Sequence, residues 1–397
     1  MKLATFTRLA RTTRPAIVLS EDEVALGVVR DLGRAHVPVL LVSPLGDNAT
    51  RFSRYCAVAP CSRRDEGEEK LVADLEALGS SLPQRGVLFP CDDDYIPIVS
   101  RHKRRLQAYY DVPLPDWEAQ QVLASKERQL LLAERAGVPA PVSRIIRDAG
   151  DLGTAADVVP FPALLKPLVP KERFRAVEHR VVVIETRARL EASYAEHAST
   201  GPFLLQEIVP GGDDQVWIAG TYHDASSRCL ALFTGRKLRQ HPRGFGVARL
   251  CESRRADDVA DLASRLLIEA RYHGCADVEF RRDSRDGRLK FMEINARQGY
   301  WIGLPTAAGV NLSLIAYADM TGQTCPVRAQ RDGVRWIDAL HDVPDSVREV
   351  RRGQLTVRQW LMPLAGVRAD AYLSGRDPWP GIYATFRTAR WHLQRGA

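Results

Sequence analysis

The sequence predicts an α/β protein that begins with a parallel sheet covered by helices and continues into an antiparallel sheet. Two stretches carry this prediction. Near the N-terminus, Ala16 to Ser20 and Val37 to Val42 read as buried strands on either side of a helix from Glu23 to His36, an order typical of parallel sheets. Later, the strand patterns Ala276 to Phe280 and Leu289 to Asn295 flank a charged stretch that ends in Asp-Gly, which predicts an antiparallel hairpin.

The N-terminal part is expected to be a doubly wound, Rossmann-like domain. A helix from about Glu68 to Leu78 leads to the strand Gly86 to Pro90, and three aspartates, Asp92 to Asp94, follow that strand. Strand ends are where α/β proteins place ligands, but the same aspartates also suit the N-cap of the next helix. Gly27 and Gly33 do not form the GxGxxG fingerprint, so a dinucleotide site here has little support.

Breaker residues divide the rest of the chain. The prolines of Val112-Pro-Leu-Pro115 mark a boundary, and the helical sequence that starts at Asp116 ends at Gly137-Val-Pro139. Short strands with one helix follow, and a strongly periodic helix from Asp257 to His273 leads into the hairpin. Beyond Thr324 the pattern weakens. We therefore expect an N-terminal domain at 1–114, a second domain at 115–325 with a subdomain at about 141–205, and a C-terminal accessory region at 326–397.

Composition narrows the class of protein. The 397 residues are 45% hydrophobic and 26% charged, as in ordinary globular proteins. A net charge of +7 suits anionic small molecules or surfaces, but the basic residues lie throughout the chain without a nucleic-acid-binding signature, so no nucleic-acid role is expected. Without an apolar run of membrane-spanning length, the expected location is the cytoplasm. The seven cysteines lack CxxC spacing, so we expect reduced, packed thiols.

Polar side chains gather on the predicted hairpin. Strand alternation places Glu293 and Asn295 on the same face as Phe291, and Asp277 shares a face of its own strand with Glu279. Folding the chain back at the turn brings Asp277 opposite Glu293, with Asn295 close by. Two carboxylates and an amide oxygen form a hard donor set that suits Mg²⁺. The alternative is an exposed hairpin with a solvated polar face.

Two lysines and one strand-to-turn segment supply groups that a nucleotide needs. Lys126 lies in the helical stretch before the Gly-Val-Pro break, and Lys166 closes a short apolar strand. Phe203 to Val209 reads as a strand that runs into a Pro-Gly turn, where unpaired backbone groups can contact an adenine edge. The following acids, Asp213 and Asp214, can accept hydrogen bonds from ribose hydroxyls. Surface lysines and an ordinary edge-strand turn are the alternatives.

These motifs stand in the order found in ATP-grasp carboxylate-amine ligases, which the chain resembles from about residue 115 to 310. The set comprises Ser125-Lys126 with Ala136-Gly-Val-Pro-Ala-Pro141, Phe161-Pro-Ala-Leu-Leu-Lys166, Gln206-Glu-Ile-Val-Pro-Gly211, Asp277, and Glu293-Ile-Asn-Ala-Arg297. The resemblance implies an ATP-grasp fold with an N-terminal doubly wound parallel-sheet domain, a central α+β lid subdomain and an antiparallel-sheet catalytic domain. Thr234 to Gln240, followed by Gly244-Phe-Gly246, is similar to D-aspartate ligase-like members of the family.

The resemblance also implies a role for each candidate residue. Lys126 and Lys166 would hold ATP phosphates, backbone groups around Gln206, Glu207 and Val209 would meet adenine, and Asp213 or Asp214 would bind ribose. Asp277, Glu293 and Asn295 would hold two Mg²⁺ ions, for which Mn²⁺ could substitute. Arg297 would reach the reacting carboxylate. Lys237 and Arg239, which alternate onto one face of a strand, would pair with phosphate or substrate carboxylate, unless that face is a solvated strand edge.

Two features depart from the family pattern. The loop between Lys166 and Val181 lacks the glycines usual in the phosphate-covering loop and carries basic residues instead. Cys275 stands where some relatives have an arginine, so Arg249 or Arg297 is the expected partner of the oxyanion.

By this resemblance, the chain is expected to be an ATP-dependent ligase that joins small carboxylate and amine substrates, such as amino acids or peptides, through an acyl phosphate. The competing functions are an ATP-grasp carboxylase or another acyl-phosphate enzyme with a non-amine nucleophile, and a scaffold that binds ATP without turnover. His241 and His273 are candidates for the base only by their proximity in sequence. The C-terminal region would complete the pocket, form a homodimer contact, or touch an anionic surface through Arg387, Arg390 and Arg395.

Overall fold

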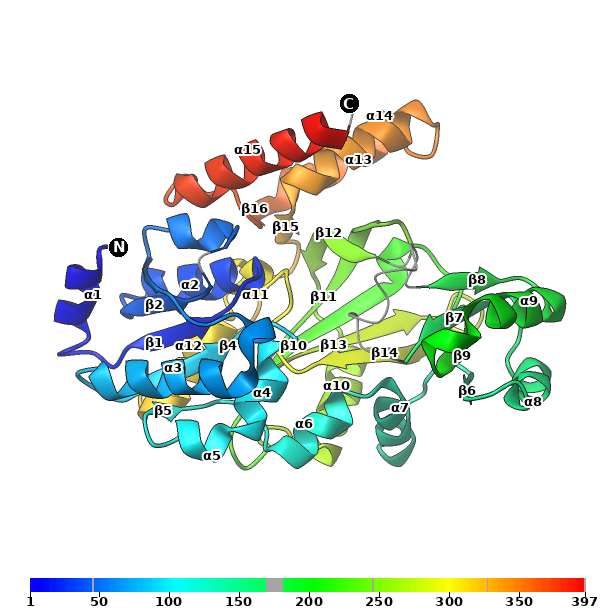
Figure 1. The fold of residues 1–397 in the computed structure, drawn as a ribbon. Helices are drawn as coiled ribbons and strands as arrows, with labels where there is room; N and C mark the ends of the chain where they lie inside the picture. The colour runs from blue at the N-terminus through cyan, green and yellow to red at the C-terminus, as the bar shows by residue number, and fades with distance from the viewer. Residues whose placement is uncertain (45, 169–180, 245, 327, 396–397) are drawn as a thin grey trace.

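The computed structural model describes residues 1–44, 46–168, 181–244, 246–326 and 328–395. These residues form a five-stranded parallel sheet, a four-stranded antiparallel sheet and a seven-stranded, mostly antiparallel sheet. Figure 1 shows the parallel sheet and the four-stranded sheet at opposite ends of the molecule, with the seven-stranded sheet between them. The predicted fold class, with its parallel N-terminal sheet followed by antiparallel sheets, is therefore confirmed.

The parallel sheet has the strand order β3-β2-β1-β4-β5. Its strands are β1 (Ala16–Leu19), β2 (Val39–Val42), β3 (Cys56–Ala59), β4 (Gly86–Pro90) and β5 (Tyr110–Asp111), and its helical segments are α1 (Leu3–Leu9), α2 (Val24–Arg34), η1 (Ala49–Phe52), η2 (Arg64–Glu66), α3 (Glu68–Ser81), α4 (Tyr95–Arg101) and α5 (Lys103–Leu106). Both β1 and β2 are apolar and fully buried because helices cover both faces of a parallel sheet. Ser20 Oγ donates to Asp92 Oδ1 at 2.5 Å, so Asp92 joins the carboxyl ends of β1 and β4 instead of capping α4.

Two short helices lead to the four-stranded sheet. They are α6 (Trp117–Leu123) and α7 (Lys126–Arg135), so the helical stretch expected from Asp116 is divided. The division lies at Ser125, whose side chain accepts from the backbone N–H of Arg128 and caps α7. Lys126 therefore begins a helix. The sheet itself comprises β6 (Ser143–Ile146), β7 (Ala163–Pro167), β8 (Val182–Ile184) and β9 (Phe203–Glu207), with α8 (Asp151–Val158), α9 (Arg187–His197) and η4 (Ala198–Thr200).

The seven-stranded sheet has the order β14-β13-β10-β11-β12-β15-β16. Its strands are β10 (Val216–His223), β11 (Cys229–His241), β12 (Val247–Ser253), β13 (Gly274–Arg282), β14 (Leu289–Asn295), β15 (Arg335–Ile337) and β16 (Val367–Asp370). The associated helical segments are η5 (Asp213–Gln215), α10 (Asp257–Glu269), α11 (Gly303–Ala308) and α12 (Leu312–Thr321). The C-terminal region thus adds two strands to this sheet, although its weak sequence pattern gave no sign of them. It also forms α13 (Ala339–Arg351), α14 (Val357–Leu361), η6 (Met362–Gly366) and α15 (Pro378–Arg395).

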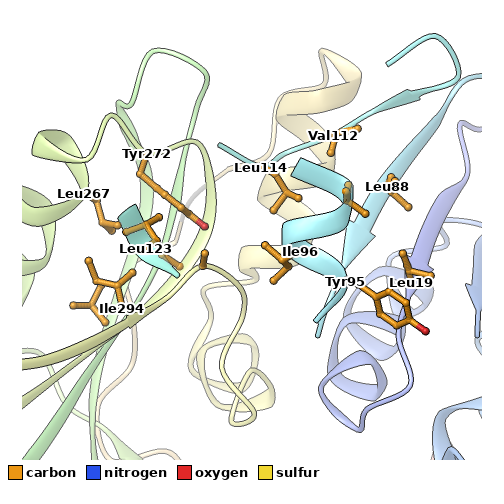
Figure 2. Packing of buried hydrophobic residues seen from close by; sticks show 14 of the residues in the cluster. Leu19, Leu88, Tyr95, Ile96, Val112, Leu114, Leu123, Leu267, Tyr272 and Ile294 are labelled. Carbon is orange, nitrogen blue, oxygen red and sulfur yellow. The ribbon is translucent and has the colours of Figure 1, made fainter. Parts of the chain in front are cut away.

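One continuous hydrophobic core joins the parallel sheet to the seven-stranded sheet. Figure 2 shows part of it, with side chains from the N-terminal domain facing those of α6, α10 and β14. The labelled residues are Leu19, Leu88, Tyr95, Ile96, Val112, Leu114, Leu123, Leu267, Tyr272 and Ile294. The four-stranded sheet instead has a separate core around Leu165 and Leu205. None of the helices in the described part of the chain has the length and apolar character needed to span a bilayer.

Candidate active site

A cavity of about 720 Å³ opens between the four-stranded and seven-stranded sheets. Ten of the predicted site residues line it: Lys126, Lys166, Gln206, Glu207, Val209, Lys237, Asp277, Glu293, Asn295 and Arg297. The other three, Asp213, Asp214 and Arg239, are described by the structure but lie outside this lining. Residues as far apart in the sequence as Lys126 and Arg297 therefore line the same cavity.

The β13–β14 hairpin forms one wall of this cavity. Glu279 pairs with Glu293, and Asp277 pairs with Asn295. The predicted pairing of Asp277 with Glu293 is therefore wrong by two residues, a shift that keeps every side chain on its face. As a result, Glu279 is a cavity residue that the predicted metal set had omitted, although its shared face with Asp277 was visible in the alternation.

A β-bulge changes which face Glu293 occupies. Glu279 pairs with Glu293 but the next residue, Phe280, pairs with Phe291, so Met292 is an extra residue in β14. The bulge reverses the alternation, and Phe291 packs against Phe280 in the core while Glu293 lies on the opposite face. The expectation that Phe291 and Glu293 share a face is therefore wrong. Simple alternation could not reveal this because a bulge depends on the pairing partner.

The carboxylates of this wall repel one another in a buried setting. Asp277 is only 7% exposed, and its Oδ1 is buried without a hydrogen-bond partner in the described structure. Burial, followed by the negative charge of Glu279, raises the pKa of Asp277 to about 7. Burial also raises the pKa of Glu279, even though Lys237 Nζ lies 2.5 Å from its carboxylate. A bound cation would relieve this repulsion.

The donor set fits magnesium better than a transition metal. The described residues contain no group of three or more His, Cys, Asp or Glu side chains arranged to hold a metal ion. Mg²⁺ does not need such a group, because it binds through one or two carboxylates and completes its shell with water and phosphate. The opposed Glu279 and Glu293, with Asn295 and the unpartnered oxygen of Asp277 beside them, match that requirement.

Two lysines bring positive charge to the cavity from another wall. Lys126 begins α7, and Lys166 on β7 donates to Gln206 Oε1 at 2.8 Å. Burial, followed by repulsion from Lys126, lowers the pKa of Lys166 to about 8. Two ammonium groups that disfavour each other form a site that a multiply charged anion would stabilise.

The segment from β9 contributes backbone and apolar surface. Gln206 and Val209 line the cavity beside the apolar side chains of Leu164 and Leu204. The carboxylate of Glu207 is hydrogen-bonded to other groups of the protein: it accepts from the backbone N–H of Val142 at 3.1 Å and from Lys290 Nζ. Burial opposes its charge, but the bonds to Lys290 and Val142 outweigh this and lower the pKa of Glu207.

Asp213 is not among the residues that line the cavity, and its carboxylate is hydrogen-bonded within the protein. It lies in η5, and its carboxylate accepts from the backbone and side-chain N–H groups of Gln240 and from the backbone N–H of Gly244, each at 3.0 Å. These bonds hold the β11–β12 connection, which itself lines the cavity. Asp213 is therefore placed to support the site. Neither Asp213 nor Asp214 is among the residues that line the cavity, and their contact with ribose stays a prediction.

Arg239 and Lys237 do not share a face. The pairing of β11 with β12 shifts between these two residues, so the alternation is broken. Lys237 lines the cavity, whereas Arg239 forms a two-pronged ion pair with Asp342 of α13 at 2.7 and 2.8 Å. Both groups of this pair are buried. Arg239 therefore attaches the C-terminal region to the sheet, and its predicted substrate contact is not supported.

Arg297 lines the cavity and Arg249 does not, as with Lys237 and Arg239. Arg297 lines the cavity and forms a two-pronged ion pair with Asp93 of the N-terminal domain at 2.7 and 3.0 Å. Arg249 is fully buried outside the lining and donates to Glu349 Oε1 at 2.5 Å. Of the two arginines considered as oxyanion partners, only Arg297 borders the cavity.

The two histidine candidates are also separated. His241 lines the cavity, and its Nδ1 contacts the carboxylate of Asp345. His273 lies outside the lining with a buried Nε2 that has no partner in the described structure. Burial lowers the pKa of His273 to about 4. The predicted glycine-poor covering loop is 168–180, and its residues 169–180 lie outside the described residues.

Comparisons with known proteins bear on this arrangement. No protein-family model matches the chain. Over 319 residues it is 23% identical to D-aspartate ligase of Enterococcus faecium (strain Aus0004), a match that covers 76% of each protein.

Three solved structures with the same fold are named here. An L-amino acid ligase from Bacillus licheniformis has a TM-score of 0.59 at 13% identity, covering 78% of this chain and 74% of that one. An N5-carboxyaminoimidazole ribonucleotide synthetase in complex with ADP has a TM-score of 0.64 at 12% identity, covering 85% of each chain. A third structure is the biotin carboxylase domain of Hydrogenobacter thermophilus 2-oxoglutarate carboxylase in complex with MgADP, ADP and bicarbonate. It has a TM-score of 0.65 at 13% identity, covering 82% of this chain and 74% of that one. The chain therefore has the ATP-grasp fold of these structures and is a distant homologue of D-aspartate ligase.

Proposed function

We propose that this chain is an ATP-dependent carboxylate-amine ligase that forms an amide or peptide bond and releases ADP and phosphate. One observation carries the proposal. A single cavity has lysines from α7 and β7 on one wall, the opposed pair Glu279 and Glu293 on another, and Arg297 where the cavity approaches the N-terminal domain. The relative named D-aspartate ligase supports an amino acid as one of the two substrates.

Different walls of the cavity would contact the adenine and the phosphates of ATP. Apolar side chains such as Leu164, Leu204 and Val209 would contact the adenine faces, next to the end of β9, where backbone groups can meet its edge. Lys126 and Lys166 would form charge-assisted bonds with the phosphates. This assignment explains why two lysines face a shared space despite their mutual repulsion.

The carboxylate wall would hold the magnesium ions. Glu279, Glu293 and Asn295 are the ligands we propose, with Asp277 beside them, and two ions fit the number of carboxylates. When bound, Mg²⁺ neutralises phosphate charge and withdraws electrons from the phosphoryl group. Mn²⁺ has the same preference for oxygen ligands and would substitute.

The chemistry then proceeds in two displacements. A carboxylate oxygen of the first substrate attacks the γ-phosphorus of ATP, and the bond from that phosphorus to the bridging oxygen breaks, which releases ADP. The amine nitrogen of the second substrate attacks the acyl carbon, phosphate leaves, and the nitrogen gives up a proton. Arg297 would orient the carboxylate, while Lys126, Lys166 and Lys237 stabilise the charge that develops on the phosphoryl oxygens.

The first test is ADP release over a panel of amino acids and dipeptides, supplied as carboxylate and amine partners. We expect release that requires both partners and yields a product whose mass equals the sum of the two minus water. The Glu279→Gln variant serves as the control for contaminating ATPase. Release that depends on bicarbonate instead of an amine would replace the ligase by a carboxylase, and tight ATP binding without turnover would replace it by a scaffold.

A further inference from the structure

The outer face of α15 is apolar and exposed. Trp379, Ile382 and Phe386 are 62%, 41% and 71% exposed, and their spacing puts them on one side of the helix. Leu373 and Phe52 are 46% and 40% exposed and extend this surface. The Phe52 ring lies 4.3 Å from the ring of Tyr383, next to Ile382, so the extension is continuous with the helix. We call these five residues the α15 face.

The inner side of α15 is anchored, so the α15 face cannot turn inward. Ala384 and Tyr372 pack in a small core with Leu26 and Ala49 of the N-terminal domain. Just before the helix, the buried Asp377 accepts from Arg30 Nε at 3.0 Å and from Ser53 Oγ at 2.9 Å. The five large apolar side chains therefore stay at the surface in the folded chain.

Within residues 339–390, the span that holds α13, α14 and most of α15, the exposed charged side chains are all basic. Between residues 339 and 390, all of which the structure describes, no Asp or Glu is exposed: Asp342, Asp345 and Asp377 are buried in ion pairs, and Glu349 and Asp370 are half-buried. The exposed charged side chains of this span are Arg348, Arg351, Arg352, Arg358, Arg368, Arg376 and Arg390. Figure 1 shows the three helices of this span, α13, α14 and α15, along one edge of the molecule. Outside this span, Asp47 is an acidic residue with a 61% exposed side chain beside the helix, and it accepts a hydrogen bond from Tyr383 and pairs with Arg387.

We propose that the α15 face docks onto the surface of a lipid bilayer that contains anionic headgroups. Aromatic and aliphatic side chains on one side of a helix enter the headgroup boundary, and flanking arginines are attracted to the negative surface potential. The arginines distinguish this partner from a second copy of the chain. A two-fold contact through the α15 face would bring Arg376 and Arg390 of one copy towards the same arginines of the other.

Cosedimentation of the full chain with vesicles tests the proposal. We expect binding to vesicles of phosphatidylcholine with phosphatidylglycerol, little binding to phosphatidylcholine alone, and weaker binding as salt is raised. Trp379→Ala with Phe386→Ala should weaken binding at least about tenfold, since two large apolar side chains are lost. The matched control is Ile268→Ala on α10, which removes an equally exposed apolar side chain elsewhere and should leave binding unchanged.

Three results would overturn the proposal. They are no binding to either kind of vesicle, equal binding of the double variant and the parent chain, and a stable dimer that the double variant converts to a monomer, since a second copy would then cover the α15 face. Because the substituted side chains are exposed, unchanged thermal unfolding of the variants is expected and separates lost docking from lost folding.

Discussion

Replacing Glu293 by glutamine should lower turnover by about 10²–10³-fold without weakening the fold. Glutamine keeps the size of the side chain and removes only its charge. The hydrogen bond that the structure gives this carboxylate is a long one, 3.4 Å from Asn295 Nδ2, so little native bonding depends on the charge. The substitution therefore separates a role in metal binding from a role in packing.

The pairing of Glu279 with Glu293 in the hairpin sets the expected change in stability. Opposed residues have Cβ atoms about 5 Å apart, and charges about 6 Å apart repel by about 3 kcal/mol at an effective dielectric constant of about 20. Lys237 offsets part of the charge of Glu279, so we expect the free energy of unfolding of the metal-free variant to rise by about 0–2 kcal/mol. Loss of one charged group that supports phosphoryl transfer should lower kcat by about 10²–10³-fold.

A coupled assay for ADP measures kcat, and urea unfolding with a chelator present measures stability. Glu127→Gln, on the exposed side of α7, is the matched control and should change neither quantity. Turnover within tenfold of the parent enzyme would refute the assignment of Glu293 to the metal. A loss of more than about 2 kcal/mol in stability would instead make Glu293 a structural residue.

Three further predictions follow from buried charges. Because the pKa of Lys166 is lowered to about 8 in the free protein and phosphates favour the ammonium form, ATP affinity should be flat below about pH 8 and fall as the pH rises above it. Calorimetry at several pH values measures the ATP affinity of the parent chain and of Lys166→Arg, and the variant should lose this pH dependence. An ATP affinity that increases with pH would contradict the prediction. Asp342→Asn removes a buried negative charge from Arg239 and Arg249 and should lower the free energy of unfolding by about 3–5 kcal/mol. The control Asp286→Asn, at an exposed position, should lower it by less than about 0.5 kcal/mol. Equal losses of the two variants in denaturant unfolding would contradict this prediction. Burial lowers the pKa of His223 to about 4 from its usual 6.5, so the unfolded chain takes up the proton first and stability should fall by up to about 3 kcal/mol as the pH drops from about 6.5 to about 4. His223→Phe should remove that part of the loss, and an unchanged pH profile of unfolding would show that the histidine is not responsible.

Local patterns predicted the parts of the fold that depend on neighbouring residues. The apolar runs of β1 and β2 have only one compatible environment, a sheet covered on both faces. Lys126, Lys166, Glu293 and Arg297 were found because their motifs keep a fixed order along the chain, and all four line one cavity.

The residues that were misplaced depend on contacts between distant segments. The bulge at Met292 and the shift between Lys237 and Arg239 arise from pairing with another strand, which no single stretch of sequence specifies. The hydrogen bonds of Asp213 were not predicted for a similar reason, since its partners Gln240 and Gly244 follow about thirty residues later. Glu279 was within reach of sequence reasoning, because registers that differ by two residues keep the same face.

The proposed function requires that a substrate carboxylate be activated by phosphorylation, and transfer of an oxygen isotope from that carboxylate tests this claim. The carboxylate partner that supports ADP release is supplied with both oxygens as ¹⁸O, and the inorganic phosphate is analysed by mass spectrometry. Attack of the carboxylate on the γ-phosphorus predicts one ¹⁸O atom in each phosphate released with the amide product. Unlabelled phosphate formed together with amide would contradict the claim, because the oxygen lost from the acid would then have gone elsewhere.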